Sequence, residues 1–318
     1  MRPFRSLLRV LVALLLLAPA CARSDGPAPA GTASSSATGT AAPFPVTIVD
    51  DDGVSVTLDA PPQRIVTFAP SATEILFALG LGDRIVGVSG PYDDYPQAAK
   101  RIEQVGGAGE FGVEPNLEKV ISLQPDLLLT ISGGEQWKKP LRDLGVPVFT
   151  IDATDLEDLL HDIGTVGRLT GAVDAADALT AGMRAEDQDI EQRVAGEPPV
   201  TCFFEVFYPP LTTVGPDTFI ADLLRGAGCD SVSESAKSDY PEWSVDDLVR
   251  ESPQLYLVSS ESGASPAAVA KRPGFDAIAA VADGHVVPID SDLVSRPGPR
   301  IVDGLRELAE ALHPNAFA

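Results

Sequence analysis

Two acidic residues occupy equivalent places in a unit that the chain carries twice. The stretches NLEKVISLQPDLLL (116–129) and SVDDLVRESPQLYL (244–257) each read as a short helix, a proline stop and an apolar strand. Aligning Pro125 with Pro253 places Glu118 on Asp246. Two exposed carboxylates could each form a charge-assisted hydrogen bond with an arginine, and the two contacts would add by avidity.

Helix capping is the alternative explanation of these acids. Asn116 and Ser244 are favoured N-cap residues, and Asp247 could complete a capping box with Ser244. An acid in the first helical turn is stabilised by the helix dipole by about 0.3–1 kcal/mol. One copy alone would be interpreted as a capped helix, whereas the recurrence favours a paired docking function. For Asp246 the capping explanation stays open.

The first residues of the chain indicate export. Three arginines precede or enter an apolar run that ends in small residues, which is typical of a signal peptide over 1–20. Cys21 follows in LAPAC, which looks like a bacterial lipobox and predicts a lipidated cysteine, with ordinary cleavage near Ala20 as the alternative. Residues 21–43 are rich in Gly, Ala, Ser, Thr and Pro, so we expect a lipid-anchored flexible tether.

Cysteine and histidine are scarce, with three of each in 318 residues. Cys202 and Cys229 are predicted to form a disulfide because an exported chain is disulfide-permissive; two buried free thiols are the alternative. No metal site is predicted, because the histidines lie far apart and lack metal-ligand spacing. They are His161, His285 and His313.

Beyond the tether, short apolar strands alternate with capped helices. Strands such as RIVTF (64–68) and LYLVS (255–259) are continuously apolar, which is typical of a parallel sheet covered on both faces. Residues 155–195 are helical throughout and carry no strand signal. The prediction is an α/β protein of two lobes, with mainly parallel sheets flanked by helices, joined by one long backbone helix. A ligand cleft is expected between the lobes.

The predicted boundaries follow from this alternation and from the repeat. We place an N-terminal lobe at 44–172, the connecting helix at 173–196 and a C-terminal lobe at 197–318.

The formal net charge of −23 repels phosphate backbones, so nucleic acid is not expected as a partner.

Several blocks of this sequence resemble one known family. RIVTFAPSATEILFALGLGDRIVGVSGPYDDYPQAAK followed by NLEKVISLQPDLLLT resembles the helical-backbone class of ABC-transporter substrate-binding proteins, which capture cobalamin, ferric siderophores or haem. The resemblance covers about residues 45–314. EVFYPPLTTVGPDTFIADLLRGAG and SRPGPRIVDGLRELAEALHP are similar to its cobalamin-binding members.

The resemblance implies two functional regions. One acid of each lobe, here Glu118 and Asp246, would dock on the permease dimer of an importer that also has ATPase subunits. Loops at the carboxyl ends of the strands would build the pocket, and they hold many of the chain's aromatic residues. The ligand-binding residues that the resemblance implies are Ser71, Tyr92, Phe111, Ser132, Tyr208, Leu211, Tyr240, Trp243 and Arg296.

Three ligand classes fit such a pocket to different degrees. Flat aromatic walls suit a corrin or porphyrin face, while Arg296 could meet an anionic ferric siderophore. No histidine lies in the expected cleft loops to ligate haem, which leaves the tyrosines of these loops as the alternative ligands. We therefore place a cobalamin-like corrinoid first, a ferric siderophore second and haem third, with no intrinsic cofactor. The protein is expected on the outer face of the cytoplasmic membrane.

An exported α/β enzyme is the alternative from a different class. The sequence has no GxSxG, HExxH or GxxxxGK[ST] motif. Carboxylates could still supply acid–base chemistry. The sequence therefore favours a binding protein over an enzyme.

Overall fold

The computed structural model describes residues 44–106 and 115–318. All of the described residues belong to one compact unit, whose limits along the chain are Gly39–Ala318. The predicted signal peptide 1–20, Cys21, the tether 21–43 and Phe111 lie outside the described residues. No helix of the described part is long and apolar enough to cross a membrane.

The N-terminal lobe is built on a four-stranded sheet of order β4-β3-β5-β6, in which every pairing is parallel. An antiparallel hairpin of β1 and β2 precedes it. The elements of this lobe are β1 Val46–Val49, β2 Ser55–Leu58, β3 Ile65–Phe68, α1 Pro70–Ala78, β4 Ile85–Gly87, α2 Leu117–Ser122, β5 Leu127–Thr130, α3 Glu135–Asp143, β6 Val148–Thr150 and α4 Leu156–Thr170.

The C-terminal lobe repeats this architecture with a parallel sheet of order β10-β9-β7-β8. Its elements are β7 Val200–Glu205, α6 Phe219–Gly226, β8 Cys229–Ser231, α7 Val245–Glu251, β9 Leu255–Ser259, α8 Pro266–Val269, α9 Ala279–Ala282, β10 Val286–Ile289, α10 Ser291–Val294 and α11 Ile301–Leu312. The structure confirms the predicted fold class, with helix-flanked parallel sheets in two lobes.

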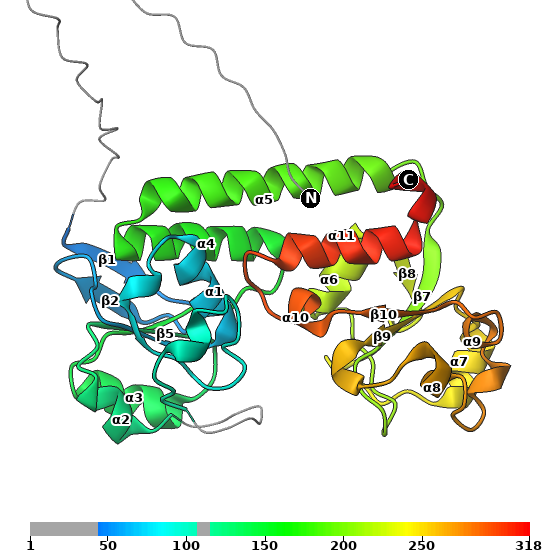
Figure 1. The fold of residues 1–318 in the computed structure, drawn as a ribbon, viewed down its shortest axis with the longest axis horizontal. Coiled ribbons are helices and arrows are strands. Elements are labelled where there is room, and N and C mark those ends of the chain that lie inside the picture. Colours follow the sequence, from blue (N-terminus) through cyan, green and yellow to red (C-terminus); the bar gives the residue numbers. More distant parts are fainter. Residues whose placement is uncertain (1–43, 107–114) are drawn as a thin grey trace, which may run out of the picture. The chain divides into compact units, whose positions relative to one another are not determined.

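One long helix, α5 Val173–Val194, runs past both lobes. Its 22 residues correspond to about 33 Å of helix. Helix α4 of the N-terminal lobe and α11 of the C-terminal lobe both pack against it (Figure 1). Met183 and Ile190 of α5 belong to a buried core that continues from one lobe into the other. The lobes are therefore joined by packed helices as well as by the chain.

Alternation along the strands buries both faces of each sheet. In β5, Leu127 and Leu129 join the core shared by the two lobes, while Leu128 faces a second cluster with Val120 of α2. In β7, Phe203 faces a separate cluster on the outer side of its sheet. The continuously apolar strands of the sequence are explained by this two-sided burial.

The duplication is visible in the backbone. Helices α2 and α7 begin at equivalent positions of the repeat, and so do strands β5 and β9. Gln124 and Ser252, which are also equivalent, are the non-glycine residues with positive φ in the described part of the chain, at 50° and 52°. Each supplies the same left-handed turn between helix and strand. The two copies therefore share an unusual backbone feature as well as a sequence pattern.

Cys202 and Cys229 are bonded through their sulfur atoms, with 5.8 Å between their Cα atoms. This separation lies within the usual range for a disulfide. Cys202 lies in β7 and Cys229 begins the neighbouring strand β8. The bond therefore ties the edge strand of the C-terminal sheet to its neighbour.

Candidate functional site

A cavity of about 710 Å³ lies between residues of the two lobes. All four strands of the N-terminal sheet point their carboxyl ends toward it, because the segments that follow β3, β4, β5 and β6 line it. In the C-terminal lobe the segments after β9 and β10 line it. The carboxyl edge of a parallel sheet is the usual ligand site of such folds.

The N-terminal wall combines aromatic, apolar and hydroxyl groups. Ser71, Tyr92 and Ser132, three of the residues predicted to bind ligand, line the cavity. Phe68 and Trp137 lie in the same wall, where their rings pack edge to face at 5.1 Å between centroids. Trp137 is only 6% exposed and packs with Phe68 in a core cluster, whereas Tyr92 is 52% exposed. The wall therefore combines one exposed aromatic ring and two more buried ones with a few hydrogen-bonding groups, a composition typical of small-molecule sites.

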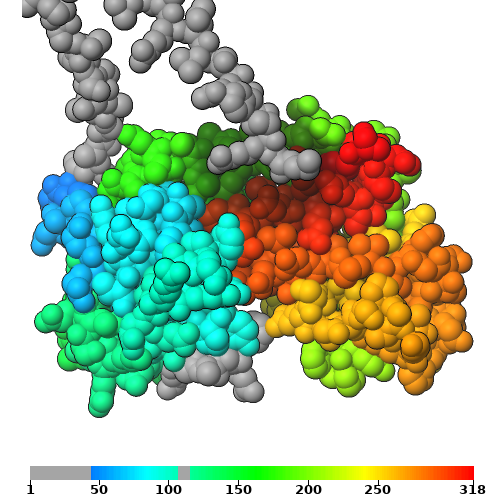
Figure 2. Space-filling model, in the orientation of Figure 1, coloured from blue at the N-terminus to red at the C-terminus, as the bar shows by residue number. Residues whose placement is uncertain are grey.

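The C-terminal wall consists of two short segments. Ser260 and Glu261 follow β9, and residues 291–297 begin just after β10. Figure 2 shows the cyan loops of the N-terminal lobe facing the yellow and orange segments of the C-terminal lobe. Arg296, the fourth predicted ligand residue found in the lining, belongs to the segment after β10.

Four other predicted ligand residues lie outside the cavity lining. Tyr208, Leu211 and Trp243 pack in or against the outer cluster of the C-terminal lobe, and Leu211 is buried there. Tyr240 is 58% exposed. These residues belong to loops near β7. In the strand order β10-β9-β7-β8, β7 lies on the far side of β9 from β10. Their contact with ligand stays a prediction.

The loops that carry these residues form a single platform. Thr212 forms β-bridges with both Phe207 and Glu242, so the segments 207–212 and 239–243 are joined. Phe207 and Tyr240 are the exposed aromatic residues of this platform, as Tyr92 and Tyr95 are of the N-terminal lobe. The platform therefore presents two aromatic rings to its surroundings.

The ring of Tyr208 packs against a charged network formed by Arg272, Glu205 and Tyr256. The guanidinium of Arg272 lies 4.1 Å from the Tyr208 ring centroid and donates to Glu205, with 3.0 Å between Nη2 and Oε1. Tyr256 donates to the same carboxylate. Burial, followed by the charge of Glu205, raises the pKa of Tyr256. The network therefore restricts the position of the Tyr208 ring.

Arg296 and Arg300 join the lobes through an interlobe ion-pair cluster, formed with Glu74, Asp94 and Asp292. Arg300 donates to Glu74 through Nε and Nη2, at 2.8 and 2.7 Å. Arg296 pairs with Asp94 at 3.0 Å and with Asp292 at 2.7 Å. The Arg296 side chain is therefore already neutralised where it borders the cavity.

Glu74 is a functional candidate that sequence reasoning missed. It lies within α1 in a segment that reads as an ordinary capped helix, yet only 4% of it is exposed. A buried charged residue of this kind is almost always paired. The signal was an acid at an otherwise apolar helical position. Its partners, Arg296 and Arg300, come from the far end of the chain, so they could not be read from the local pattern.

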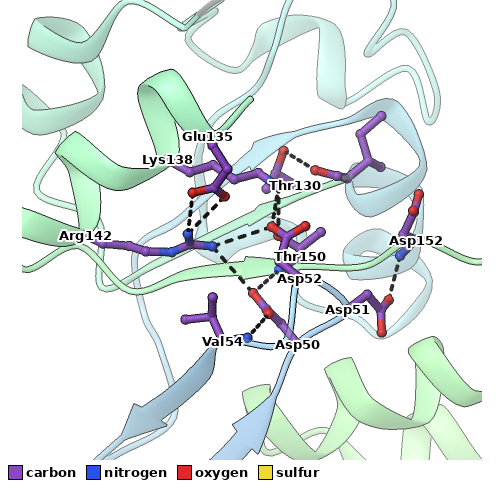
Figure 3. Close-up of polar contacts among 11 residues, drawn as sticks. Asp50, Asp51, Asp52, Val54, Thr130, Glu135, Lys138, Arg142, Thr150 and Asp152 are labelled. Atoms are coloured by element: carbon purple, nitrogen blue, oxygen red, sulfur yellow. Dashed lines mark hydrogen bonds and ion pairs between the residues drawn. The ribbon is translucent and has the colours of Figure 1, made fainter. Parts of the chain in front are cut away.

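The β1–β2 turn braces one wall of the cavity through a second ionic network. Lys138 of α3 is fully buried and donates to Asp52 at 2.7 Å and to Thr150 at 3.0 Å (Figure 3). Although burial raises the pKa of Asp52, the hydrogen bonds from Lys138 and Thr150 hold it below its usual value. Asp50 accepts from the backbone N–H of Thr150 at 3.1 Å. These bonds fix α3, which contributes to the cavity wall, against the edge strand β6.

A group of acids lies where β6 leads into the cavity. Asp51 accepts from the backbone N–H of Asp152 at 2.7 Å (Figure 3). Asp152 and Asp162 both line the cavity, and Asp162 is only 5% exposed. Burial, reinforced by the charges of Asp51, Asp158 and Asp152, raises the pKa of Asp162 to about 7. The wall is therefore acidic at this end.

Asp162 should make stability depend on pH. Its folded pKa of about 7 exceeds the ordinary value of 3.8, so its contribution to stability is full below 3.8 and is lost as pH rises through 7. Asp162→Asn removes the buried charge and should raise the free energy of unfolding more at pH 8 than at pH 4.5, by about 2 kcal/mol. Urea denaturation at both pH values measures this difference. An equal effect at the two pH values would contradict the prediction.

The two proposed docking acids have matching local structure. Asn116 and Ser244 cap their helices by accepting from the N–H groups of Lys119 and Asp247, at 3.0 and 2.9 Å. Glu118 and Asp246 are each the second residue of their helix and are exposed. Among the described residues, neither carboxylate makes a hydrogen bond or ion pair.

The capping role in the second copy falls to another residue. The carboxylate of Asp247 accepts from the Ser244 hydroxyl at 2.6 Å and pairs with Arg250. The hydrogen bond from Ser244, and then that from Arg250, lower the pKa of Asp247. Asp246 is therefore not needed for the capping box. Figure 1 shows α2 and α7 in different lobes, both away from α5.

Comparisons with known proteins agree with this architecture. A family model described as periplasmic binding protein matches residues 65–293. The ABC transporter substrate-binding lipoprotein YvrC of Bacillus subtilis is 36% identical over 286 residues, covering 86% of this chain and 87% of the relative. A cobalamin-binding protein of Halobacterium salinarum is 32% identical, covering 98% of this chain and 84% of the relative.

Solved structures give the same assignment of fold. The periplasmic vitamin B12 binding protein BtuF of Vibrio cholerae matches with a TM-score of 0.70 and 25% identity, covering 81% of this chain and 98% of BtuF. An ABC-type Fe3+-hydroxamate transport system protein of Saccharomonospora viridis matches with a TM-score of 0.68 and 26% identity, covering 84% of this chain and 99% of that protein.

These matches decide between the two classes that the sequence left open. The family comprises binding proteins of transport systems, so the alternative of an exported enzyme is rejected. The chain belongs to the periplasmic binding protein family and is the substrate-binding protein of an ABC importer.

Proposed function

We propose that this chain is an extracytoplasmic lipoprotein that captures a corrinoid between its lobes and delivers it to an ABC importer permease. The observation that carries the proposal is the cavity at the carboxyl ends of six parallel strands, with the exposed ring of Tyr92 and the more buried rings of Phe68 and Trp137 in its wall. Flat aromatic surface suits a macrocycle. The names of the Halobacterium relative and of BtuF favour cobalamin as the macrocycle.

A ferric siderophore is the second candidate. The structural match to an Fe3+-hydroxamate transport protein favours it, because a neutral hydroxamate chelate could occupy the same cavity. Haem is a weaker candidate, since no histidine is found among the described lining residues to ligate its iron. The ligand in each case is a metal chelate brought from outside, and no intrinsic cofactor is proposed.

Membrane attachment is proposed through Cys21. The LAPAC sequence and the name of the lipoprotein YvrC support a lipid anchor on this cysteine. A tether over 21–43 would let the folded unit reach its permease on the outer face of the cytoplasmic membrane. The permease dimer and its ATPase subunits are the proposed partners, with Glu118 and Asp246 as the docking residues.

Tryptophan fluorescence tests the ligand assignment at the site itself. Trp137 lines the cavity and Trp243, the other tryptophan, lies outside it. Titration of the compact unit Gly39–Ala318 with cyanocobalamin should quench tryptophan fluorescence with a Kd below about 10 μM. In Trp243→Phe the remaining signal comes from Trp137, and it should still be quenched, whatever the effect of the substitution on Kd. Free N-acetyltryptophanamide corrects for light absorbed by the corrin. Quenching by ferrichrome but not by cyanocobalamin would reject the corrinoid in favour of a siderophore.

A further inference from the structure

The charges in the cavity wall are strongly unbalanced. Four acidic residues line it, Asp152, Asp162, Glu261 and Asp292, whereas Arg296 is the one basic residue among the described lining residues. Asp162, with its pKa of about 7, is largely neutral at pH 6.5, so Asp152, Glu261 and Asp292 carry the negative charge there. The segment 107–114, GAGEFGVE, contains no lysine or arginine in its sequence. A ligand in this cavity therefore meets an excess of negative charge.

The single arginine does not offset this excess. Its guanidinium pairs with Asp94 at 3.0 Å and Asp292 at 2.7 Å, and lies 3.8 Å from Glu74. The adjacent Arg300 is engaged by both oxygens of Glu74 and lies 4.0 Å from the Tyr95 ring centroid. An anionic ligand would have to break one of these pairs to find a cation.

Two of the acids remain without such partners. Asp152 follows β6 and Glu261 follows β9, so they approach the cavity from opposite lobes. Both are exposed, and neither carboxylate is in an ion pair among the described residues. In a partly enclosed site the repulsion between like charges is screened less than on an open surface. Their field therefore acts on any charged group that enters.

We propose that the cavity selects its metal chelate by charge, admitting neutral and cationic chelates and rejecting anionic ones that carry free carboxylates or catecholates. The inference rests on the proposed function, because it concerns the ligand of the same site. Within corrinoids, amide-bearing neutral and cationic forms are accepted. Within siderophores, neutral or cationic hydroxamates are accepted and anionic catecholates are not.

Corrinoids of nearly identical size but different net charge test how the charge of the ligand affects its affinity. Cyanocobalamin has no net charge, aquacobalamin carries one positive charge at pH 6.5, and the monocarboxylic acid of cyanocobalamin, with one amide hydrolysed, carries one negative charge. Calorimetric titration of Gly39–Ala318 should give at least a tenfold weaker Kd for the acid than for cyanocobalamin. Aquacobalamin should bind at least as tightly as cyanocobalamin. Equal or tighter binding of the acid would overturn the proposal.

A second ligand series separates this proposal from the corrinoid assignment. If no corrinoid binds, the same titration is made with ferrioxamine B (cationic), ferrichrome (neutral) and ferric enterobactin (anionic). Binding of either of the first two, with the third at least tenfold weaker, supports selection by charge although the corrinoid assignment has failed. Preference for ferric enterobactin, or no binding by any neutral or cationic member of both series, overturns it.

A matched pair of double variants locates the effect. Asp152→Asn with Glu261→Gln removes two charges from the cavity, and Asp59→Asn with Asp283→Asn removes two from exposed positions outside its lining. In the cavity variant, the Kd of the monocarboxylic acid divided by the Kd of cyanocobalamin should fall at least threefold. The control should leave the ratio within twofold. An equal fall of this ratio in both variants would mean that the overall charge of the protein, not the cavity wall, sets the preference.

Discussion

Removing the charges of Glu118 and Asp246 should stop delivery while leaving capture intact. In Glu118→Gln with Asp246→Asn we expect uptake of labelled cobalamin by cells to fall at least tenfold. Each acid is exposed and makes no ion pair among the described residues, so it is available to a partner. A charge-assisted hydrogen bond contributes about 1.5–3 kcal/mol, and two lost contacts weaken docking together.

The isosteric changes distinguish docking from helix capping. The N-caps Asn116 and Ser244 and the box residue Asp247 remain in place, so the helices should lose no more than the dipole contribution of about 0.3–1 kcal/mol each. Ligand affinity of the purified protein should stay within twofold, because neither acid lines the cavity. Each single variant should show a loss of cobalamin uptake intermediate between those of the unmodified protein and the double variant.

A control variant carries the same change in charge elsewhere. Asp59→Asn with Glu310→Gln alters two exposed acids that are not part of the repeated unit, and its uptake should match that of the unmodified protein. Normal uptake by the double variant of Glu118 and Asp246, with normal ligand affinity, would remove the docking hypothesis and leave capping as the explanation of both acids.

The second large effect is expected at Glu74. Glu74→Ala should lower the free energy of unfolding by about 2–3 kcal/mol. It leaves Arg300 without its bidentate partner and removes one of the carboxylates that pair with Arg296. Breaking a buried ion pair costs about 3–5 kcal/mol, and we expect less here because Arg300 is partly exposed. Thermal unfolding of Gly39–Ala318 should shift down by about 3–5 °C.

The same variant tests whether the cluster holds the lobes together. Glu74 comes from α1 of the N-terminal lobe, and Arg296 and Arg300 come from the segment before α11. Solution scattering should show a larger radius of gyration for Glu74→Ala than for the unmodified protein. Glu310→Ala, an exposed acid of α11, should change stability by less than about 0.5 kcal/mol. A Glu74→Ala protein as stable and as compact as its parent would show that the cluster is incidental.

The repeated unit explains why so much of the fold could be predicted from the sequence. Helix propensity, N-caps and apolar strand runs are local signals, and the alignment of the two copies relates α2 to α7 and β5 to β9 directly. The long helix was predicted at 173–196 and is found at Val173–Val194. Local patterns of this kind are sufficient for element type and approximate bounds.

The cavity was harder to predict, because it depends on contacts between distant segments. Ser71, Tyr92, Ser132 and Arg296 were named and line it, but Glu261 and Asp162 were missed. Which loops face the cavity is set by the strand order β10-β9-β7-β8, and no local pattern specifies that order. The neutralisation of Arg296 likewise depends on Asp94, which belongs to the other lobe.

The central claim is that a corrinoid binds between the two lobes, and the position of its cobalt tests this most directly. Crystals of Gly39–Ala318 grown with cyanocobalamin, measured at the cobalt absorption edge, should show one anomalous peak in the cavity, flanked by the segments after β4 and β5 on one side and after β9 and β10 on the other. A cobalt peak elsewhere on the protein, or its absence at saturating cyanocobalamin, would contradict the account.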